Sequence, residues 1–241
     1  MKKVIALIPA RSGSKGIKDK NIKKLGSHAL IEWSIAACLA SKEINKTIVS
    51  TDSEKYADIA KEMGAYVPFL RPAKISDDLS TDYQFIIHAL DFLAQSNEEP
   101  EYIVHIRPTT PFRSVDLIDK AILSFISNPN ATALRSVQPM SESAYKTFEI
   151  AKTGQLKRIC SENTELDNAN NARQSFPTTY FANGYVDVLS TAFIRSKHSI
   201  HGNNVMPFIT PTVGEVDTEE DFRMLQQELQ LNPEIHKQIF K

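Results

Sequence analysis

Cysteine is scarce in this sequence: Cys38 and Cys160 are the two among 241 residues, and no Cys-x-x-Cys spacing occurs. Disulfide-rich domains and cysteine-ligated zinc sites need several closely spaced cysteines, so both classes are excluded. Because so few cysteines fit a reducing compartment, we expect the protein to be cytoplasmic.

An excess of charge and long apolar runs are lacking as well. Lys and Arg total 28 against 29 Asp and Glu, so the overall basic excess that binds nucleic acid nonspecifically is absent, and we expect no nucleic-acid partner. The apolar run at residues 4–10 ends at Arg11 and is too short for a signal peptide or a membrane span, so we expect no membrane partner. A hydrophobic content of 41% with 24% charged residues predicts a folded globular chain.

Glycine is also scarce, at 8 in 241, which is about half the usual frequency. Each glycine is therefore expected to mark a turn or a close backbone approach. Gly13 and Gly16 fall in one loop, directly after the first apolar run.

Hydrophobic periodicity predicts alternating strands and helices along most of the chain. This pattern is typical of an α/β fold with three Rossmann-like layers, in which a mostly parallel sheet lies between helices. We expect one domain over residues 1–241, interrupted by a polar arm or flap at about 138–179 that has no apolar period. The expected strands are 4–8, 47–50, 102–106, 132–137, 180–189 and 205–209, and the expected helices are 30–39, 53–63, 83–93, one around 118–125, and 219–229.

The loop at residues 9–21 concentrates cations and small residues immediately after the first strand. Glycine and serine let backbone N–H groups turn toward an anion, while Arg11, Lys15 and Lys20 can neutralise phosphate charges. The loop therefore predicts a triphosphate site. It matches neither the P-loop pattern nor GxGxxG. The alternative is a solvated lysine-rich loop without a ligand.

The chain resembles the CMP-sialic acid synthetases, or acylneuraminate cytidylyltransferases. The segment IPARSGSKGIKDKN at 8–21 matches that family's phosphate loop. Further matches follow in order along nearly the whole chain: Ser50-Thr51-Asp52, Arg71-Pro72 with Asp77-Asp78, Arg107 to Arg113, Arg173-Gln174, Asn183-Gly184, and Val216 to Asp221. The resemblance implies a nucleotidyltransferase-type fold whose arm joins two copies into a homodimer.

The resemblance implies a reaction between CTP and an acidic keto sugar, in which the anomeric hydroxyl attacks the α-phosphorus and pyrophosphate leaves. It assigns catalysis to Arg11, Lys20 and Asp217. The resemblance also gives Arg71 to the nucleotide, and the alternative for this residue is a surface ion pair. The residues expected to bind the nucleotide are Ala10, Arg11, Ser14, Lys15, Lys20, Asn21, Arg71 and Ser80.

The resemblance also implies a divalent metal, Mg²⁺ or Mn²⁺, held by Glu215 and Asp217. These carboxylates stand at i and i+2, so they share one side of an extended segment. The family usually has aspartate at the first position, which leaves the role of Glu215 open. The alternative is that Asp217 or Thr218 only caps the following helix.

The sugar is expected to contact cations that can bind its carboxylate. Arg107 stands where sialate-activating relatives carry glutamine, and Asp187 stands where several carry tyrosine. These departures favour a legionaminic or pseudaminic type of nonulosonic acid. The resemblance assigns sugar binding to Arg107, Lys146, Arg173, Asn183 and Asp187, partly through the arm of a neighbouring subunit.

The sequence also leaves the roles of two histidines and several rival functions open. His105 is expected to be a satisfied core residue, and His201 is a candidate sugar contact. The rival functions are an enzyme activating keto-deoxyoctulosonate, a CTP-binding regulatory protein that lacks turnover, and a Rossmann dehydrogenase. The dehydrogenase is disfavoured because no GxGxxG follows the first strand.

Overall fold

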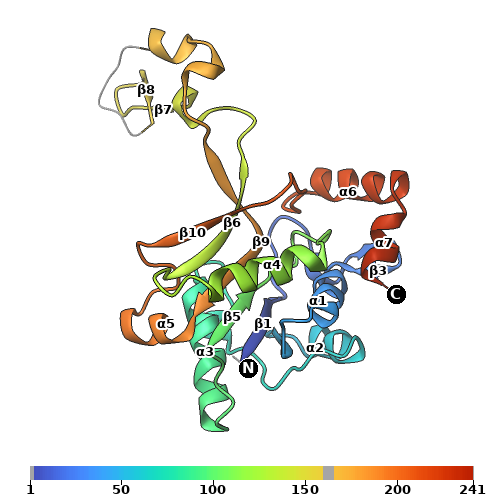
Figure 1. Ribbon diagram of the computed structural model, residues 1–241. Coiled ribbons are helices and arrows are strands. Elements are labelled where there is room, and N and C mark those ends of the chain that lie inside the picture. The colour runs from blue at the N-terminus through green and yellow to red at the C-terminus, as the bar shows by residue number, and fades with distance from the viewer. Residues whose placement is uncertain (1–2, 160–165, 241) are drawn as a thin grey trace.

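A six-stranded sheet forms the centre of the computed structural model, which describes residues 3–159 and 166–240. Its strand order is β10-β6-β9-β5-β1-β4, and all neighbours pair in parallel except β9, which is antiparallel to both β5 and β6. The predicted α/β fold is confirmed (Figure 1). The strands of this sheet are β1 (Val4–Pro9), β4 (Lys46–Ser50), β5 (Tyr102–His105), β6 (Ala133–Pro139), β9 (Tyr180–Ser190) and β10 (Val205–Ile209).

Helices cover both faces of the sheet. Alternate residues of each strand point to opposite faces, and both faces are apolar, so each needs a layer of helices to bury it. In β1, Val4, Ala6 and Ile8 pack in one cluster with α1, α2 and α4. Ile5 and Leu7 pack in a second cluster with α3 and α5. The helices are α1 (Leu30–Ala40), α2 (Glu54–Glu62), α3 (Asp82–Gln95), α4 (Val115–Ile126), α5 (Thr191–Lys197), α6 (Glu219–Leu231) and α7 (Glu234–Ile239).

A third apolar cluster joins the C-terminal helices to the segment that follows the first loop. Trp33 of α1 packs with Phe222 of α6 and Ile239 of α7. The Trp33 indole N–H donates to the Leu25 carbonyl at 3.1 Å, which ties α1 to a small hairpin of β2 (Lys24–Leu25) and β3 (His28–Ala29). Two short connections are also helical, η1 (Lys20–Ile22) and η2 (Ala73–Ile75). This cluster holds the C-terminal segment against the first loop.

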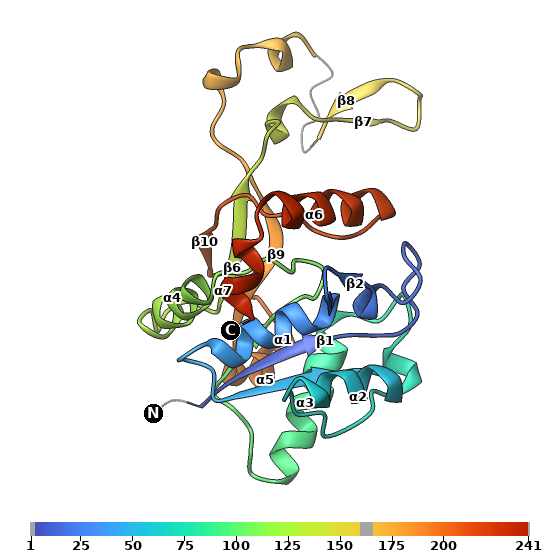
Figure 2. The ribbon, with the colours of Figure 1, turned by 90° about the vertical axis from the view of Figure 1, so that its right-hand side faces the viewer.

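The segment between β6 and β9 stands away from the body of the molecule (Figures 1 and 2). Strands β6 and β9 stay paired as far as Pro139 and Tyr180, and we call residues 140–179 the arm. Its described part contains β7 (Phe148–Ile150) paired with β8 (Leu156–Arg158), and the short helices η3 (Ala144–Lys146), η4 (Asp167–Asn170) and η5 (Arg173–Ser175).

The two cysteines and the apolar helices bear on the expectations of a reduced thiol and of no membrane span. The Cys38 thiol is buried and free, and burial raises its pKa to about 12, so it is inert at neutral pH. Cys160 lies outside the described residues. Within the described ranges, no helix combines the length and the apolar character needed to cross a bilayer.

Candidate active site

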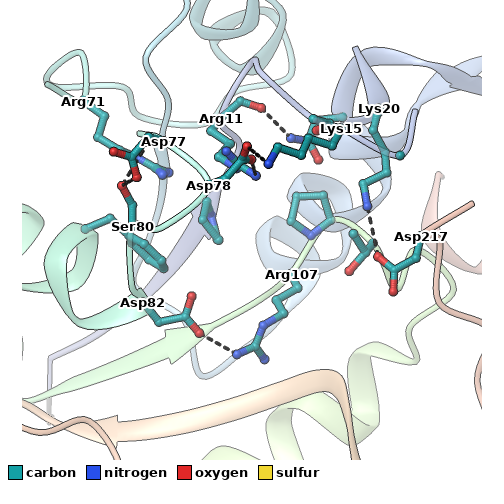
Figure 3. A pocket seen from close by; sticks show the side chains of 17 residues that line it. Arg11, Lys15, Lys20, Arg71, Asp77, Asp78, Ser80, Asp82, Arg107 and Asp217 are labelled. Carbon is teal, nitrogen blue, oxygen red and sulfur yellow. Dashed lines mark hydrogen bonds and ion pairs between the residues drawn. The ribbon is translucent and has the colours of Figure 1, made fainter. Parts of the chain in front are cut away.

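A cavity of about 560 Å³ opens at the carboxyl ends of β1 and β5 (Figure 3). Ligands bind at this edge of open α/β sheets, because the loops that follow parallel strands converge there. The cavity brings together most of the nucleotide-binding residues expected from the sequence. Its wall contains Pro9, Arg11, Ser14, Lys15, Gly16, Lys20, Asn21, Arg71, Asp77, Asp78, Ser80, Asp82, Phe85, Arg107, Pro108, Thr109 and Asp217.

Two cations of the first loop converge on one carboxylate across the cavity (Figure 3). The Arg11 Nη2 lies 2.5 Å from Asp78 Oδ1, and the Lys15 Nζ lies 2.7 Å from Asp78 Oδ2. Lys15 and then Arg11 lower the pKa of Asp78. The two cations are therefore arranged to hold a multidentate oxyanion from one side.

The loop backbone is tied to strand β4 and the segment after it. Ser12 donates from its amide and from its hydroxyl to the two Asp52 carboxylate oxygens, each at 2.8 Å. The Ala10 amide donates to the Ser50 carbonyl at 2.9 Å, and Asn21 Nδ2 donates to the Arg11 carbonyl at 3.0 Å. Ala10 is thus placed as a loop support and does not line the cavity, whereas Asn21 does both. These bonds hold the loop against β4 and the residues that follow it.

The loop also touches the C-terminal segment. A Cβ atom added to Gly16 would lie 2.3 Å from the Asp217 carbonyl oxygen, so only glycine allows this approach. Lys20 donates to the Val216 carbonyl at 2.8 Å and to Asp217 Oδ1 at 3.2 Å. The loop and Asp217, which are far apart in the sequence, therefore form one wall of the cavity (Figure 3).

The two carboxylates proposed as metal ligands occupy different surroundings. The Asp217 side chain is 72% exposed and lines the cavity, whereas Glu215 is half-buried and accepts from the Thr109 hydroxyl at 3.1 Å. Glu215 is not among the residues that line the cavity. Among the described residues no three His, Cys, Asp or Glu side chains gather into a metal cluster. The cap of α6 is Thr218, paired with Asp221, so Asp217 is left for the cavity.

Arg71 lies inside the protein, and its interpretation as a surface ion pair is wrong. It is 5% exposed, donates through Nε to the Ser50 hydroxyl at 3.1 Å, and lies over the Phe85 ring. Burial lowers its pKa to about 10, so it stays charged at neutral pH. Ser80 faces the cavity from the next loop, where its hydroxyl donates to Asp77 Oδ1 at 2.8 Å.

Arg107 extends into the cavity from the loop after β5, held by two carboxylates. Its Nη2 donates to Asp82 Oδ2 at 2.7 Å and its Nη1 donates to Asp187 Oδ2 at 3.2 Å. Burial alone would lower the pKa of Arg107, but Asp187 and Asp82 outweigh it and raise the pKa. Asp187 is 1% exposed, so it lies behind Arg107 and not on the cavity wall. His201 Nε2 is 3.7 Å from the same Asp187 oxygen.

The other residues expected to bind the sugar lie apart from this cavity in the same chain. In the arm, Lys146 Nζ donates to the Asn171 carbonyl at 3.2 Å, and Arg173 Nη2 donates to the Met140 carbonyl at 3.0 Å. Arg173 lines a second cavity of about 420 Å³. Asn183 is buried and donates to Gln138 Oε1 at 3.1 Å and to Thr210 Oγ1 at 2.6 Å.

Two acidic residues that hold the candidate site together were not singled out in the sequence. Asp82 is the first residue of α3, where an acidic residue is common for electrostatic reasons alone, so nothing singled it out. Asp52 was visible only as part of a motif. The expectation of a satisfied His105 is wrong: it is buried in β5 as predicted, but neither ring nitrogen has a hydrogen-bond partner among residues 3–159 and 166–240, and burial lowers its pKa to about 4.

Comparisons with known proteins agree on one family. The cytidylyltransferase family model matches residues 5–202. A Legionella pneumophila protein described as CMP-N,N'-diacetyllegionaminic acid synthase is 30% identical over 248 residues, covering 96% of this chain and 98% of that protein. A Campylobacter coli protein described as post-translational flagellin modification protein B is 29% identical over 232 residues, 94% of each chain.

Among solved structures, a CMP-2-keto-3-deoxy-manno-octonic acid synthetase in complex with CTP has the same fold. The TM-score is 0.72 at 10% sequence identity, over 95% of this chain and 99% of that one. At this identity the likeness concerns the fold alone.

Proposed function

This chain belongs to the cytidylyltransferase family, and we propose that it couples CTP to an acidic nonulosonic sugar, giving the CMP-sugar and pyrophosphate. The full-length similarity to a diacetyllegionaminate-activating relative supports a sugar of the sialic, legionaminic or pseudaminic type. The observation that carries the proposal is the cavity, in which Arg11, Lys15 and Lys20 line one wall together with Asp217.

In this reaction the anomeric hydroxyl oxygen of the sugar attacks the α-phosphorus of CTP, and the hydroxyl proton passes to water. The bond from that phosphorus to the β-phosphate oxygen breaks, and pyrophosphate leaves with the electron pair. Negative charge grows on the departing group, and preorganised cations stabilise it. Arg11 and Lys15 supply donors from the loop, while Lys20 is oriented by Val216 and Asp217.

We include Mg²⁺ or Mn²⁺ in the proposal. Mg²⁺ in nucleotide sites takes one or two carboxylates and completes its shell with phosphates and water, so a three-residue protein cluster is not required. The exposed Asp217 carboxylate fits that donor set, with Glu215 as the candidate second carboxylate. When bound, the metal supplies positive charge that stabilises the departing pyrophosphate.

We also propose that the protein is a cytoplasmic homodimer joined through the arm. The arm exposes apolar side chains that its own hairpin cannot bury: Ile150 is 75% exposed and Leu156 is 47% exposed. Exposed apolar groups of this kind favour a protein partner, and a second copy would also bring Lys146 and Arg173 toward a neighbouring cavity. The low cysteine content supports the cytoplasmic location.

Pyrophosphate release from CTP tests the function. We expect release that requires both the metal and an acidic sugar, and the sugar panel should contain diacetyllegionaminate, pseudaminate, N-acetylneuraminate and keto-deoxyoctulosonate. Release with keto-deoxyoctulosonate alone would favour the octulosonate enzyme over the nonulosonate one. Binding of CTP without turnover of any sugar would leave a regulatory CTP-binding protein.

The contact between the first loop and Asp217 gives a matched pair of variants. Gly16→Ala places a methyl group 2.3 Å from the Asp217 carbonyl oxygen, so the loop must move away from that wall, whereas a Cβ at Gly13 meets nothing within 4 Å. We expect Gly16→Ala to lower kcat/KM for CTP about tenfold, because misplaced cations meet the phosphates poorly. Gly13→Ala should stay within about twofold of the unaltered enzyme. Equal effects of the two variants in steady-state assays would contradict the contact's role.

A further inference from the structure

Arg107 differs from the loop cations of the cavity because two carboxylates contact its one guanidinium, whereas Arg11 and Lys15 share Asp78 and Lys20 pairs with Asp217. Asp82 and Asp187 bind its two terminal nitrogens at 2.7 and 3.2 Å, so the three side chains together carry a net negative charge. A group with a net positive charge would be needed to attract a free carboxylate, because like charges at such distances repel. Arg107 is therefore poorly suited to bind the carboxylate of an acidic sugar.

Asp187 occupies a costly place for an acidic residue. It lies in the middle of the sheet at 1% exposure, and its register partners on the two neighbouring strands are His105 and Arg135. Five buried atoms around it have no hydrogen-bond partner within the described part of the chain: Asp187 Oδ1, His201 Nε2, Arg135 Nε and both His105 ring nitrogens. A buried carboxylate of this kind does not stabilise the interior of a sheet. Buried polar atoms without partners are also rare, so their presence here requires a specific reason.

The charged form of Asp187 is nevertheless maintained. Burial alone would raise its pKa, but His201, Arg107, and His105 and Arg135 on the neighbouring strands lower the pKa to about 2. Asp187 is thus ionised at neutral pH, and the contact it makes with the cavity runs through Arg107. The guanidinium has five N–H donors, and two of these are used on Asp82 and Asp187.

We propose that Asp187 is a positioning residue for Arg107. From inside the sheet it fixes the guanidinium and, with Asp82, cancels its charge. Arg107 then presents its remaining donors to an uncharged oxygen of the sugar, a hydroxyl or an amide carbonyl, and not to the carboxylate. This inference rests on the proposed function, since it concerns how that same cavity distinguishes one acidic sugar from another.

The carboxylate is common to all acidic sugars of the class, whereas amide and hydroxyl substituents vary, and this difference makes the proposal testable. The two probes are diacetyllegionaminate and N-acetylneuraminate, which share the carboxylate and differ in other substituents. The kcat/KM for each sugar is measured at saturating CTP and Mg²⁺, or an inhibition constant where a sugar is not turned over. The variants are Arg107→Gln, Asp187→Asn and the double variant.

We expect Arg107→Gln and Asp187→Asn each to change the ratio between the two sugars by about tenfold, with the KM for CTP within about twofold. In the double variant, Asp187→Asn should add nothing to Arg107→Gln, because it acts through that side chain. Arg195→Gln is the control: Arg195 is also paired with two carboxylates, Asp91 and Glu99, but lies outside the cavity, and the ratio should be unchanged.

Three results would overturn the inference. Equal losses for both sugars in Arg107→Gln would mean that Arg107 contacts a group that both sugars carry, such as the carboxylate, and does not distinguish them, and no change for either sugar would mean that it does not contact the sugar. A full additional effect of Asp187→Asn in the Arg107→Gln background would make Asp187 a structural residue. If Asp187→Asn does not fold, Asp82→Asn takes its place in the same cycle, since Asp82 is partly exposed. Failure of the unaltered enzyme with every sugar would instead reject the proposed function.

Discussion

Replacing Arg11 by alanine is expected to lower kcat/KM by about 10² or more, with most of the loss in kcat. The Arg11 guanidinium faces the cavity and lies 2.5 Å from Asp78, so it is held in place before an anion arrives. Preorganised charge of this kind stabilises the transition state more than the ground state, because pyrophosphate gains negative charge as it departs. Steady-state pyrophosphate release at varied CTP gives both constants.

Arg195→Ala is a matched control for this substitution. The side chains of Arg11 and Arg195 are 31% and 34% exposed, and each is paired with an acidic partner, so the loss of an exposed ion pair is common to both variants. Such pairs contribute little to stability. Unchanged turnover of Arg11→Ala at saturating CTP would show that the loop binds no group on which charge develops.

Local patterns predicted most of the fold. They identified helices α1 to α4 on the two faces of the sheet, and the Gly- and Lys-rich loop after β1 located the phosphate-binding candidate. The direction of β9 was not predictable, because a buried apolar strand looks the same in either direction. Helix α5 was missed because a helix of 7 residues following directly on β9 has too few turns to show a period.

The candidate site was predictable where its residues are neighbours in the sequence. Arg11, Lys15 and Lys20 belong to one loop, and their shared location follows from that alone. The clamp on Arg107 is different, because its partners are 25 and 80 residues away and meet only through α3 and β9. The family resemblance, with arginine in the place of glutamine, suggested that Arg107 brings an additional positive charge to the sugar, whereas the folded chain surrounds it with two carboxylates.

Asp217→Asn is expected to have the largest effect, a fall in kcat/KM of about 10³. The substitution removes the negative charge that orients Lys20, whose Nζ lies 3.2 Å from Asp217 Oδ1, and it removes the exposed carboxylate proposed to hold Mg²⁺. Turnover is measured over a range of Mg²⁺ concentrations. A partial recovery at high Mg²⁺ is expected if the carboxylate binds the metal, whereas a loss independent of Mg²⁺ would assign its effect to Lys20.

Glu219→Gln provides the control, because it makes the same change of carboxylate to amide two residues further along. Glu219 is exposed, pairs with Lys23 at 2.5 Å and does not line the cavity, so its loss should leave kcat/KM within about twofold. If Asp217→Asn behaved like Glu219→Gln, Asp217 would have no part in turnover. A regulatory CTP-binding protein would give a different result: it would bind CTP and show no turnover in the unaltered chain or in either variant, because it has no chemistry for this carboxylate to support.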